Sequence, residues 1–404
     1  MSINQNFPDV WPSLVLDFEN SKTLDPRITF TRSSVGTYVA SNGLIKTAAA
    51  DEPRFDHDPE TGESLGLLIE ESRTNLLTYS ENLTSGTGWS NVSQSSMTAT
   101  NVSEENPGGG STTTQITGGG LNSWWAKNFT ASVSTTYQIS LWVKVADGGA
   151  DFNVDIKFYA PGATSGAIIY GTGFNVTSSW KRVTGYVTSS ANFSGSFSRL
   201  IVLQLDNTRS FYAWGIQVEA GSFPTSYIPT SGSTLTRQPD IANITGSNFT
   251  NIFNTSEGTF VAECDRGNDG TEGNAIGAMR RSADTYYDMI QFGEFYDNAG
   301  FVGRIYAGNG SPQSAEASIG ATHTTGQGIY NRYAFTYKTD DVAGAINGII
   351  QGTDNSASLP TQLDRFLFGN YNDSRTNNNL DGHIKYLHYY PQRLTNAQLQ
   401  NLTK

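Results

Sequence analysis

Cysteine is nearly absent from this sequence. Its 404 residues include one cysteine, Cys264, so no disulfide can form within the chain. A secreted β-rich eukaryotic protein of this length usually contains several cysteines. The first residues contain no basic segment followed by an apolar one, so we expect no secretory signal. No apolar run approaches the roughly 18 residues that span a bilayer, and we expect no membrane insertion.

Positive charge is scarce as well. The chain has 25 basic and 37 acidic residues, which give a formal net charge of −12. A nucleic-acid-binding surface needs basic side chains that neutralise phosphates, so we expect no nucleic-acid partner. Only 15% of the residues are charged, against about 25% in an average globular domain, and Ser, Thr, Asn and Gly supply most of the polarity. This balance is compatible with a surface protein that meets neutral sugars or other proteins.

Motifs for catalysis and zinc binding are also missing. The four histidines (His57, His323, His383 and His388) form no His-x-x-x-His pair and no cluster with cysteine. There is no Gly-x-Ser-x-Gly nucleophile elbow and no phosphate-binding glycine loop. Two carboxylates for glycoside cleavage could come from any two loops, and no spacing points to such a pair. We therefore expect a protein that is not an enzyme.

Aromatic residues, glycine and alternating apolar patterns are abundant. Aromatics make up 12% of the chain and there are 42 glycines, a composition typical of half-buried strands joined by turns. Segments such as Thr136–Val145, Phe211–Glu219 and Gly258–Cys264 alternate apolar and polar residues. The one convincing helix follows Thr395, which can cap residues 396–402. The sequence predicts an all-β fold of tandem antiparallel β-sandwich or jelly-roll domains.

Turn-rich stretches divide the chain into three predicted segments. Residues 1–75 form a small β segment, too short for a comfortable independent core, which we expect to serve packing or attachment. Residues 76–235 form a jelly roll that ends in a linker rich in Pro, Ser, Gly and Thr. Residues 236–404 form a second sandwich.

Tryptophans are the candidate ligand-binding residues. Trp124 and Trp125 follow a glycine-rich loop, and adjacent residues of a strand point to opposite faces, so one indole should face outward. Exposed aromatic faces stack on the C–H faces of sugars, and this makes Trp124, Trp125 and also Trp89 candidates for glycan binding. Core packing and an oligomer interface are the alternatives for these positions.

An oxygen-rich loop is the candidate metal site. Calcium takes six to eight oxygen ligands, and residues 265–272 could supply several. Their spacing does not match an EF-hand, and a solvated turn is the alternative. Apart from this calcium ion, we expect no cofactor. The candidate ligands are Asp265, Asn268, Asp269 and Glu272.

The third segment resembles the concanavalin A-like, laminin-G-like lectin family. The similarity covers about 150 residues, and it implies a lectin-type sandwich closed by a final strand and a short helix. The residues that carry it are Tyr333–Tyr337, Ala345–Gly348, Arg365–Gly369, Leu380–Ile384 and Tyr389–Leu399.

The first two segments resemble a modular pattern of bacteriophage tail-fibre and other virion surface proteins. The second segment also resembles the jelly roll of a carbohydrate-binding module, with Trp142 and Trp180 in its usual strands. The strings that carry the virion resemblance are Leu24–Arg32, Pro53–Pro59, Leu65–Leu77 and Gln217–Pro229.

These resemblances imply an adhesion protein on the surface of a virion, made in a host cytoplasm. We expect it to recognise host-surface polysaccharide or other glycans without catalysis. We also expect it to contact other virion proteins through its N-terminal segment and to form a homotrimer, whose repeated sites would add avidity. A structural capsid-decoration or fibre protein is one alternative, and a polysaccharide depolymerase is another.

Overall fold

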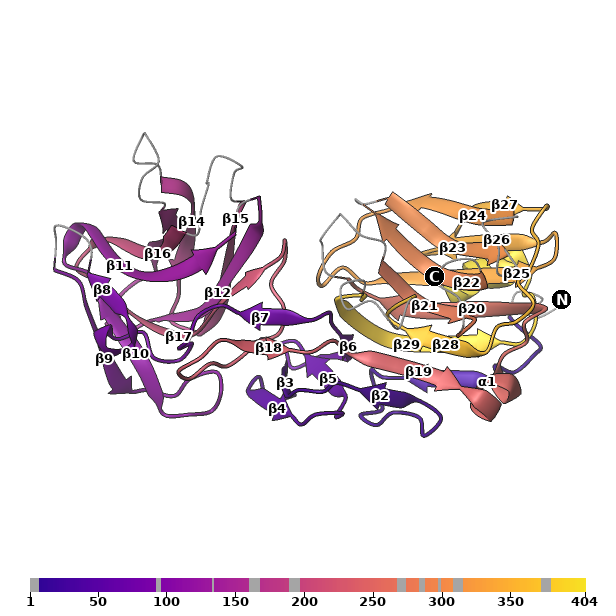
Figure 1. Ribbon diagram of the computed structural model, residues 1–404, viewed down its shortest axis with the longest axis horizontal. Coiled ribbons are helices and arrows are strands. Elements are labelled where there is room, and N and C mark those ends of the chain that lie inside the picture. The colour runs from indigo at the N-terminus through magenta and orange to yellow at the C-terminus, as the bar shows by residue number, and fades with distance from the viewer. Residues whose placement is uncertain are drawn as a thin grey trace. The chain divides into compact units, whose positions relative to one another are not determined.

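The computed structural model describes most of the 404-residue chain. The described residues are 7–91, 96–132, 134–159, 168–188, 197–266, 274–282, 288–296, 299–307, 315–371 and 379–404. Within them the regular secondary structure is almost entirely strand, and every strand pair with a recorded register is antiparallel (Figure 1). Apart from one 3-10 turn, the helices in these ranges are α1 and α2, and neither is long and apolar enough to cross a membrane. The predicted all-β sandwich architecture is confirmed.

The chain forms two compact units, one inserted into the other. The split unit consists of Met1–Gly43, Thr47–Ser72 and Gln238–Lys404. The inserted unit consists of Arg73–Arg237 together with Leu44–Lys46.

This division differs from the three predicted segments. The boundaries of the predicted middle segment, 76–235, fall close to those of the inserted unit. The predicted segments 1–75 and 236–404, however, do not form separate bodies. The physical reason is strand pairing, because β1 (Leu14–Asp17) and β6 (Ser64–Ile69) both pair with β29 (Gly382–Tyr390) near the chain's end.

The split unit contains two large sheets. The eight-stranded sheet has the order β27-β26-β25-β20-β29-β6-β5, with β1 paired to β29, and the seven-stranded sheet has the order β2-β19-β28-β21-β22-β23-β24. The remaining strands of the first sheet are β5 (Arg54–His57), β20 (Glu257–Cys264), β25 (Asn331–Lys338), β26 (Val342–Ile346) and β27 (Ile349–Asp354). Those of the second are β2 (Thr29–Thr31), β19 (Ile241–Thr245), β21 (Asn274–Arg280), β22 (Asp288–Tyr296), β23 (Ala299–Ala307), β24 (Ala315–Thr322) and β28 (Arg365–Phe368).

Aromatic rings from both sheets join the core of the split unit. Phe260 of β20 stacks on Phe292 of β22, with ring centroids 5.4 Å apart, and on Phe366 of β28 at 5.3 Å. All three side chains are buried. Offset stacking of this kind adds to the stabilisation that the burial of apolar area provides. The two sheets are therefore joined face to face by these rings.

Two short helices lie at the margins of the split unit. Residues Gly246–Ile252 form α1, which was not predicted and which buries Phe249 and Ile252. Residues Asn396–Leu402 form α2, where Thr395 and Gln398 make a reciprocal capping box. The predicted C-terminal helix and its cap are thereby confirmed.

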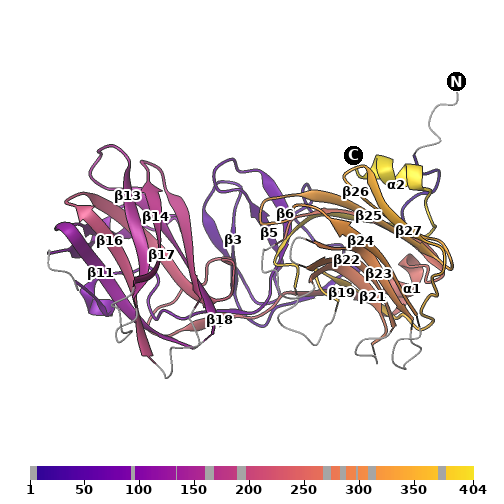
Figure 2. The ribbon, with the colours of Figure 1, turned by 90° about the horizontal axis from the view of Figure 1, so that it is seen from above.

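The inserted unit is a sandwich of two five-stranded sheets, and Figure 2 labels several of its strands. Their orders are β15-β12-β17-β10-β9 and β14-β13-β16-β11-β8, and a short pair, β7 with β18, accompanies them. The strands are β7 (Arg73–Asn75), β8 (Trp89–Asn91), β9 (Thr98–Ser103), β10 (Thr112–Thr117), β11 (Gly120–Ala131), β12 (Thr136–Val145), β13 (Phe152–Tyr159), β14 (Ile168–Val176), β15 (Lys181–Thr188), β16 (Phe197–Asn207), β17 (Ser210–Ala220) and β18 (Leu235–Arg237). Further short elements are β3 (Gly36–Val39), β4 (Ile45–Ala48), which contains a boundary between the units, and the 3-10 turn η1 (Ser85–Thr87).

Candidate functional site

The predicted ligand-binding tryptophans do not form one exposed surface. Trp89 is 1% exposed and Trp125 is 4% exposed, and both belong to the core of the inserted unit. The indole nitrogen of Trp125 donates a hydrogen bond to the buried carbonyl of Leu83 at 2.7 Å. Trp124 is half-buried, and strand alternation places it on the opposite face of β11. The structure thus assigns core packing to Trp89 and Trp125, while Trp124 keeps part of its surface in solvent.

The predicted calcium loop is described at one of its four positions. Asn268, Asp269 and Glu272 lie outside the described residues. Asp265 is buried, and protein donors surround its carboxylate. Its Oδ1 faces Nδ1 of His383 at 3.0 Å, and its Oδ2 accepts the amide of Gly328 at 2.7 Å. Among the described residues, no group of three or more His, Cys, Asp or Glu is arranged to hold a metal ion.

A hollow of about 400 Å³ opens on the inserted unit. Three segments that are distant in sequence line it: the stretch after β7, the β9–β10 hairpin, and the stretch after β17. No pattern in any one of these segments predicts the hollow, because its lining exists only after they meet. The lining residues are Tyr79, Glu81, Asn82, Asn101, Thr112, Pro229, Thr230 and Ser231.

Backbone pairing holds one wall of the hollow in place. Tyr79 and Ser231 form an isolated antiparallel bridge. The Ser80 amide donates to the carbonyl of Thr230 at 3.2 Å, and the Thr230 amide donates to the hydroxyl of Ser80 at 2.8 Å. The Ser80 hydroxyl also lies 2.6 Å from the buried hydroxyl of Tyr227. These bonds fix the backbone on which the side chains of this wall are mounted.

Hydrogen bonds also fix the orientation of two side-chain carboxamides in the lining, those of Asn101 and Asn82. The Oδ1 atom of Asn101 accepts a hydrogen bond from the Thr114 hydroxyl at 3.0 Å. The Oδ1 atom of Asn82 accepts from the amide and the hydroxyl of Thr84, at 3.0 Å and 2.7 Å. Within the described chain, neither Nδ2 group has a hydrogen-bond partner. Both amide groups therefore remain available to donate to a ligand.

A buried hydroxyl and an exposed carboxylate complete the polar lining. Thr230 is 7% exposed, and its Oγ1 atom has no hydrogen-bond partner in the described part of the chain. Buried hydroxyls are nearly always hydrogen-bonded, so this atom is a natural contact for a ligand or a water molecule. Glu81 is exposed, and its Oε1 accepts from the hydroxyl of Tyr227 at 3.1 Å. Burial and the charge of Glu81 raise the pKa of Tyr227 well above its usual value, so this phenol stays a donor.

A buried lysine contacts the tyrosine of the hollow. The ammonium of Lys127 lies 5.7 Å from the ring centroid of Tyr79 and donates to the carbonyl of Thr87. Burial lowers the pKa of Lys127. The Lys127 ammonium is thus hydrogen-bonded within the protein and does not line the hollow. Glu81 is the charged side chain among the lining residues.

The lining suits binding better than bond cleavage. One tyrosine ring, two carboxamide donors and several hydroxyls are the groups that hold sugar rings and their hydroxyls. Glycoside hydrolysis normally needs two carboxyl groups that flank the scissile bond. Among the described lining residues, Glu81 is the one acid.

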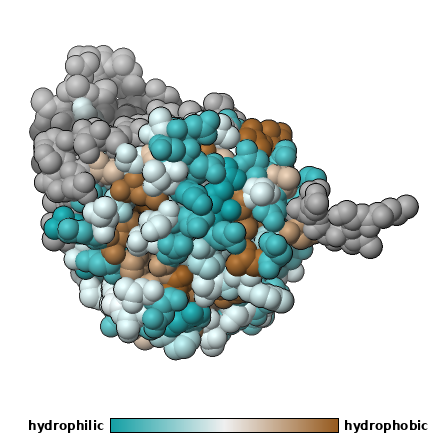
Figure 3. Space-filling view, turned by 90° about the vertical axis from the view of Figure 1, so that its right-hand side faces the viewer, coloured by the Kyte–Doolittle hydropathy of each residue, from teal (hydrophilic) through white to brown (hydrophobic). Residues whose placement is uncertain are grey.

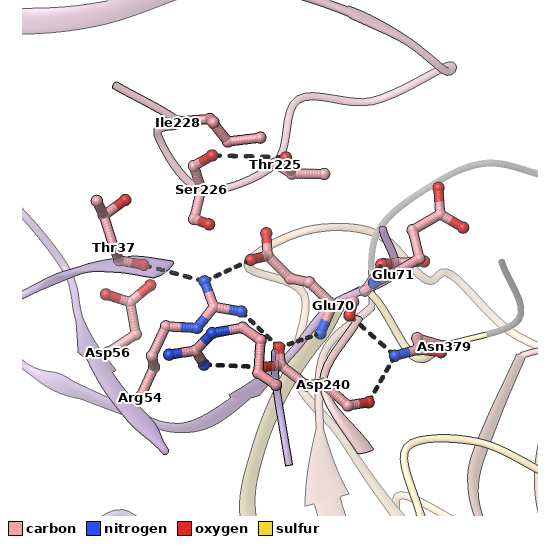
Figure 4. Close-up of polar contacts among 12 residues, drawn as sticks. Thr37, Arg54, Asp56, Glu70, Glu71, Thr225, Ser226, Ile228, Asp240 and Asn379 are labelled. Atoms are coloured by element: carbon pink, nitrogen blue, oxygen red, sulfur yellow. Dashed lines mark hydrogen bonds and ion pairs between the residues drawn. The ribbon is translucent and has the colours of Figure 1, made fainter. Parts of the chain in front are cut away.

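A buried ion network in the split unit involves residues of the virion-like strings. Figure 4 shows Arg54 between Glu70 and Asp240, with the Arg54–Glu70 pair at 2.7 Å. The guanidinium of Arg32 contacts the other oxygen of Asp240 at 3.0 Å. Asn379 donates to the carbonyls of Glu70 and Asp240, at 2.9 Å each. The side chains of Arg32, Arg54 and Asp240 are fully buried, so these groups join segments of the fold and present no surface to a ligand.

A histidine of the split unit lies between two carboxylates. Nε2 of His383 is 3.1 Å from Asp56, and Nδ1 is 3.0 Å from Asp265. Burial alone would lower the pKa of His383, but the two carboxylates outweigh it and raise that pKa to about 10. The imidazolium is therefore a buried structural cation at neutral pH. Sequence reasoning missed this triad because its members lie far apart in the chain.

An exposed apolar groove lies beside α2 in the split unit. Trp11 is 89% exposed and Phe7 is 55% exposed, and the backbone of Phe7 accepts a hydrogen bond from Gln398 at 3.1 Å. The groove has a volume of about 410 Å³ and also includes Tyr390 and Leu402. Figure 3 shows one side of the split unit, where hydrophobic patches are separated by hydrophilic surface.

Comparison with known proteins finds fold-level likeness alone. No protein-family model matches the chain, and no curated protein matches it. A carbohydrate-binding module of a Ruminococcus gnavus sialidase, bound to α2,3-sialyllactose, is similar at 12% identity over 37% of this chain and 84% of its own, with a TM-score of 0.32. A xylan-binding domain of Paenibacillus barcinonensis is similar at 15% identity over 36% of this chain and 92% of its own, with a TM-score of 0.29. The N-terminal tandem of two carbohydrate-binding modules from the same Paenibacillus barcinonensis protein covers 78% of this chain and 97% of its own, at 12% identity and a TM-score of 0.29. Values this low assign neither a family nor a ligand to the chain.

Proposed function

We propose that this protein binds glycans without modifying them, through the hollow of the inserted unit. The observation that carries the proposal is the lining of the hollow, in which one aromatic ring stands among fixed amide donors, hydroxyls and a carboxylate. A sugar offers apolar C–H faces and several hydroxyls, and this combination of groups meets both. The unpartnered hydroxyl of Thr230 supports a ligand at this place.

The finer proposal is adhesion of a virion to host-surface glycans, as a tail-fibre protein. It is supported by the resemblance of the strings around Arg32, Arg54 and Glu70 to virion surface proteins. One hollow of this size on each chain suits weak binding, and a homotrimer on a particle would add avidity. The exposed Phe7 and Trp11 favour attachment of the N-terminal segment to another virion protein. A purely structural virion protein would use that attachment and leave the hollow empty.

A glycan array tests the proposal. The full chain, displayed in several copies on a bead, should bind a defined group of host-surface glycans. The Tyr79→Ala variant should lose at least about tenfold in affinity, because the ring is the aromatic element of the hollow. Tyr186→Ala is the matched control, since Tyr186 is an exposed tyrosine of β15 that does not line the hollow. A blank array with the multivalent chain would overturn the proposal, and so would equal losses in both variants.

A further inference from the structure

We infer that the hollow prefers glycans with a free amino group, such as oligomers of glucosamine, over N-acetylated or acidic sugars. The inference rests on the proposed function and names the class of sugar. It is carried by the unneutralised carboxylate of Glu81 at the lining of the hollow.

The carboxylate of Glu81 has room for a cationic partner. Its Oε1 atom is held by the hydroxyl of Tyr227 at 3.1 Å. In the described part of the chain no lysine, arginine or histidine pairs with Glu81, and its Oε2 atom has no hydrogen-bond partner. A neutral phenol orients one oxygen and leaves the charge uncompensated, so an ammonium can form a charge-assisted hydrogen bond with the other.

The rest of the lining makes a sugar amine a better partner than a simple cation. The Nδ2 groups of Asn82 and Asn101 donate and can reach only acceptors, such as ring or hydroxyl oxygens. The Oγ1 atom of Thr230 can donate or accept, and the ring of Tyr79 offers an apolar face. A ligand that satisfies these groups together carries hydroxyls, a C–H face and one positive charge.

Acidic sugars carry a negative charge, which the carboxylate of Glu81 would repel. The ammonium of Lys127 lies 5.7 Å from the ring centroid of Tyr79, but it donates to the carbonyl of Thr87 inside the protein, and Lys127 is 7% exposed. A uronate or sialate carboxylate would therefore face Glu81 without a compensating cation, on a chain whose net charge is −12. Like charges in direct opposition weaken binding and slow the approach of the ligand.

Isothermal titration calorimetry with three hexasaccharides tests the inference. The probes are the glucosamine hexamer, the N-acetylglucosamine hexamer and the galacturonate hexamer, each titrated into the full chain at a pH that keeps the amines protonated. The glucosamine hexamer should bind about fivefold to tenfold more tightly than the acetylated one, and the galacturonate hexamer should bind least. The preference should shrink as salt is added, because an exposed charge pair is screened.

Two variants test whether Glu81 causes the preference for the glucosamine hexamer. Glu81→Gln keeps the shape of the side chain and should bring the affinities for the amino and acetylated hexamers within about twofold of each other. Glu105→Gln, a change at an exposed glutamate outside the lining, should keep the full preference. Equal or tighter binding of the acetylated hexamer overturns the inference and leaves glycan binding by the hollow intact. A preference that survives in Glu81→Gln also overturns it, because the amine would then bind elsewhere. Failure of the proposed function would appear separately, as an unchanged affinity in Tyr79→Ala.

Discussion

Asp240 accepts a hydrogen bond from the buried guanidinium of Arg32 at 3.0 Å, although 208 residues separate them in the chain. The inserted unit accounts for most of that separation. The other oxygen of Asp240 contacts Arg54, which also pairs with Glu70, so two carboxylates neutralise two buried guanidinium groups. The N-terminal strings therefore belong to the same ion network as the residue that follows the insertion. Among the charged residues of these strings, Arg54 pairs with Glu70, and both Arg32 and Arg54 pair with Asp240 inside the split unit.

Removing the carboxylate of Asp240 should destabilise the split unit strongly. Asp240→Asn leaves Arg32 and Arg54 buried without this shared acid, and loss of one partner of a buried pair costs about 3–5 kcal/mol. Urea unfolding followed by circular dichroism measures the change. Glu19→Gln is the control, because Glu19 pairs with Lys385 at the surface, and exposed pairs contribute about 0–1 kcal/mol. Similar losses in the two variants would refute the structural role of the network.

His383 should make the stability of the split unit fall as pH rises above neutrality. Its pKa is raised to about 10 in the folded chain, against an ordinary value of 6.5. Between these two values the folded state holds a proton that the unfolded state has released. The contribution is thus complete below about pH 6.5 and is lost toward pH 10, with a slope of up to about 1.4 kcal/mol per pH unit. Urea midpoints measured across this window should show the slope.

The His383→Gln variant should lack that alkaline slope. His388→Gln is the matched control, because burial lowers the pKa of His388 and its titration therefore affects stability on the acid side. If His383→Gln kept the slope of the unmodified protein, the ion pairs with Asp56 and Asp265 would not be its cause.

Alanine should not be tolerated at Gly66. This residue has a φ of +97°, and a Cβ atom there would overlap the carbonyl oxygen of Ile384 on β29. The backbone strain alone costs about 1–2 kcal/mol, and the overlap adds to it by pushing β6 away from β29. Gly320→Ala is the control, since a Cβ at Gly320 would meet nothing within 4 Å. Thermal unfolding should show a lowered Tm for Gly66→Ala alone, and equal Tm values would contradict the observed pairing.

Substitutions of the two adjacent tryptophans of β11 should differ in how much they destabilise the fold. Trp125→Phe leaves the buried carbonyl of Leu83 without its donor and opens a cavity, so we expect a loss of about 2–3 kcal/mol. Trp124→Phe should cost less than about 1 kcal/mol, because this side chain is half-buried. Neither variant should change the glycan affinity of the folded protein. A reduced glycan affinity of Trp124→Phe would instead place the ligand site on the face of β11 that carries Trp124.

The two units should fold independently. Arg73 and Arg237 are paired across β7 and β18, so the two ends of the insertion are neighbours, about 5 Å apart. We expect a chain in which a short Gly-Ser linker joins Ser72 to Gln238 to unfold cooperatively, and residues 73–237 alone to do the same. Circular dichroism melts of both fragments measure this. A fragment without a cooperative transition would show that the insertion is not autonomous.

Strand content, the class of fold and the C-terminal helix were predictable because their signals are local. Alternation of apolar and polar residues identifies a strand wherever it lies, as in Thr136–Val145 and Glu257–Cys264, although the structure buries both faces of these two strands. The cap of α2 depends on Thr395 and Gln398, which are three residues apart.

The candidate site was not predictable because none of its signals is local. Trp89, Trp124 and Trp125 have the same chemistry in the sequence, and only packing decides that two of them are core. A hollow formed by segments near Tyr79, Asn101 and Thr230 has no counterpart in any single stretch of residues.

The sequence by itself determined that this protein is a set of antiparallel sandwiches with few charges, because strand periodicity and composition act residue by residue. The tertiary structure decided that Arg32 and Asp240 close one split unit, and that Glu81 stands unneutralised beside two amide donors. These relationships depend on distances between segments far apart in the chain. Such distances are set by the pairing of sheets and the burial of side chains, which no local pattern encodes.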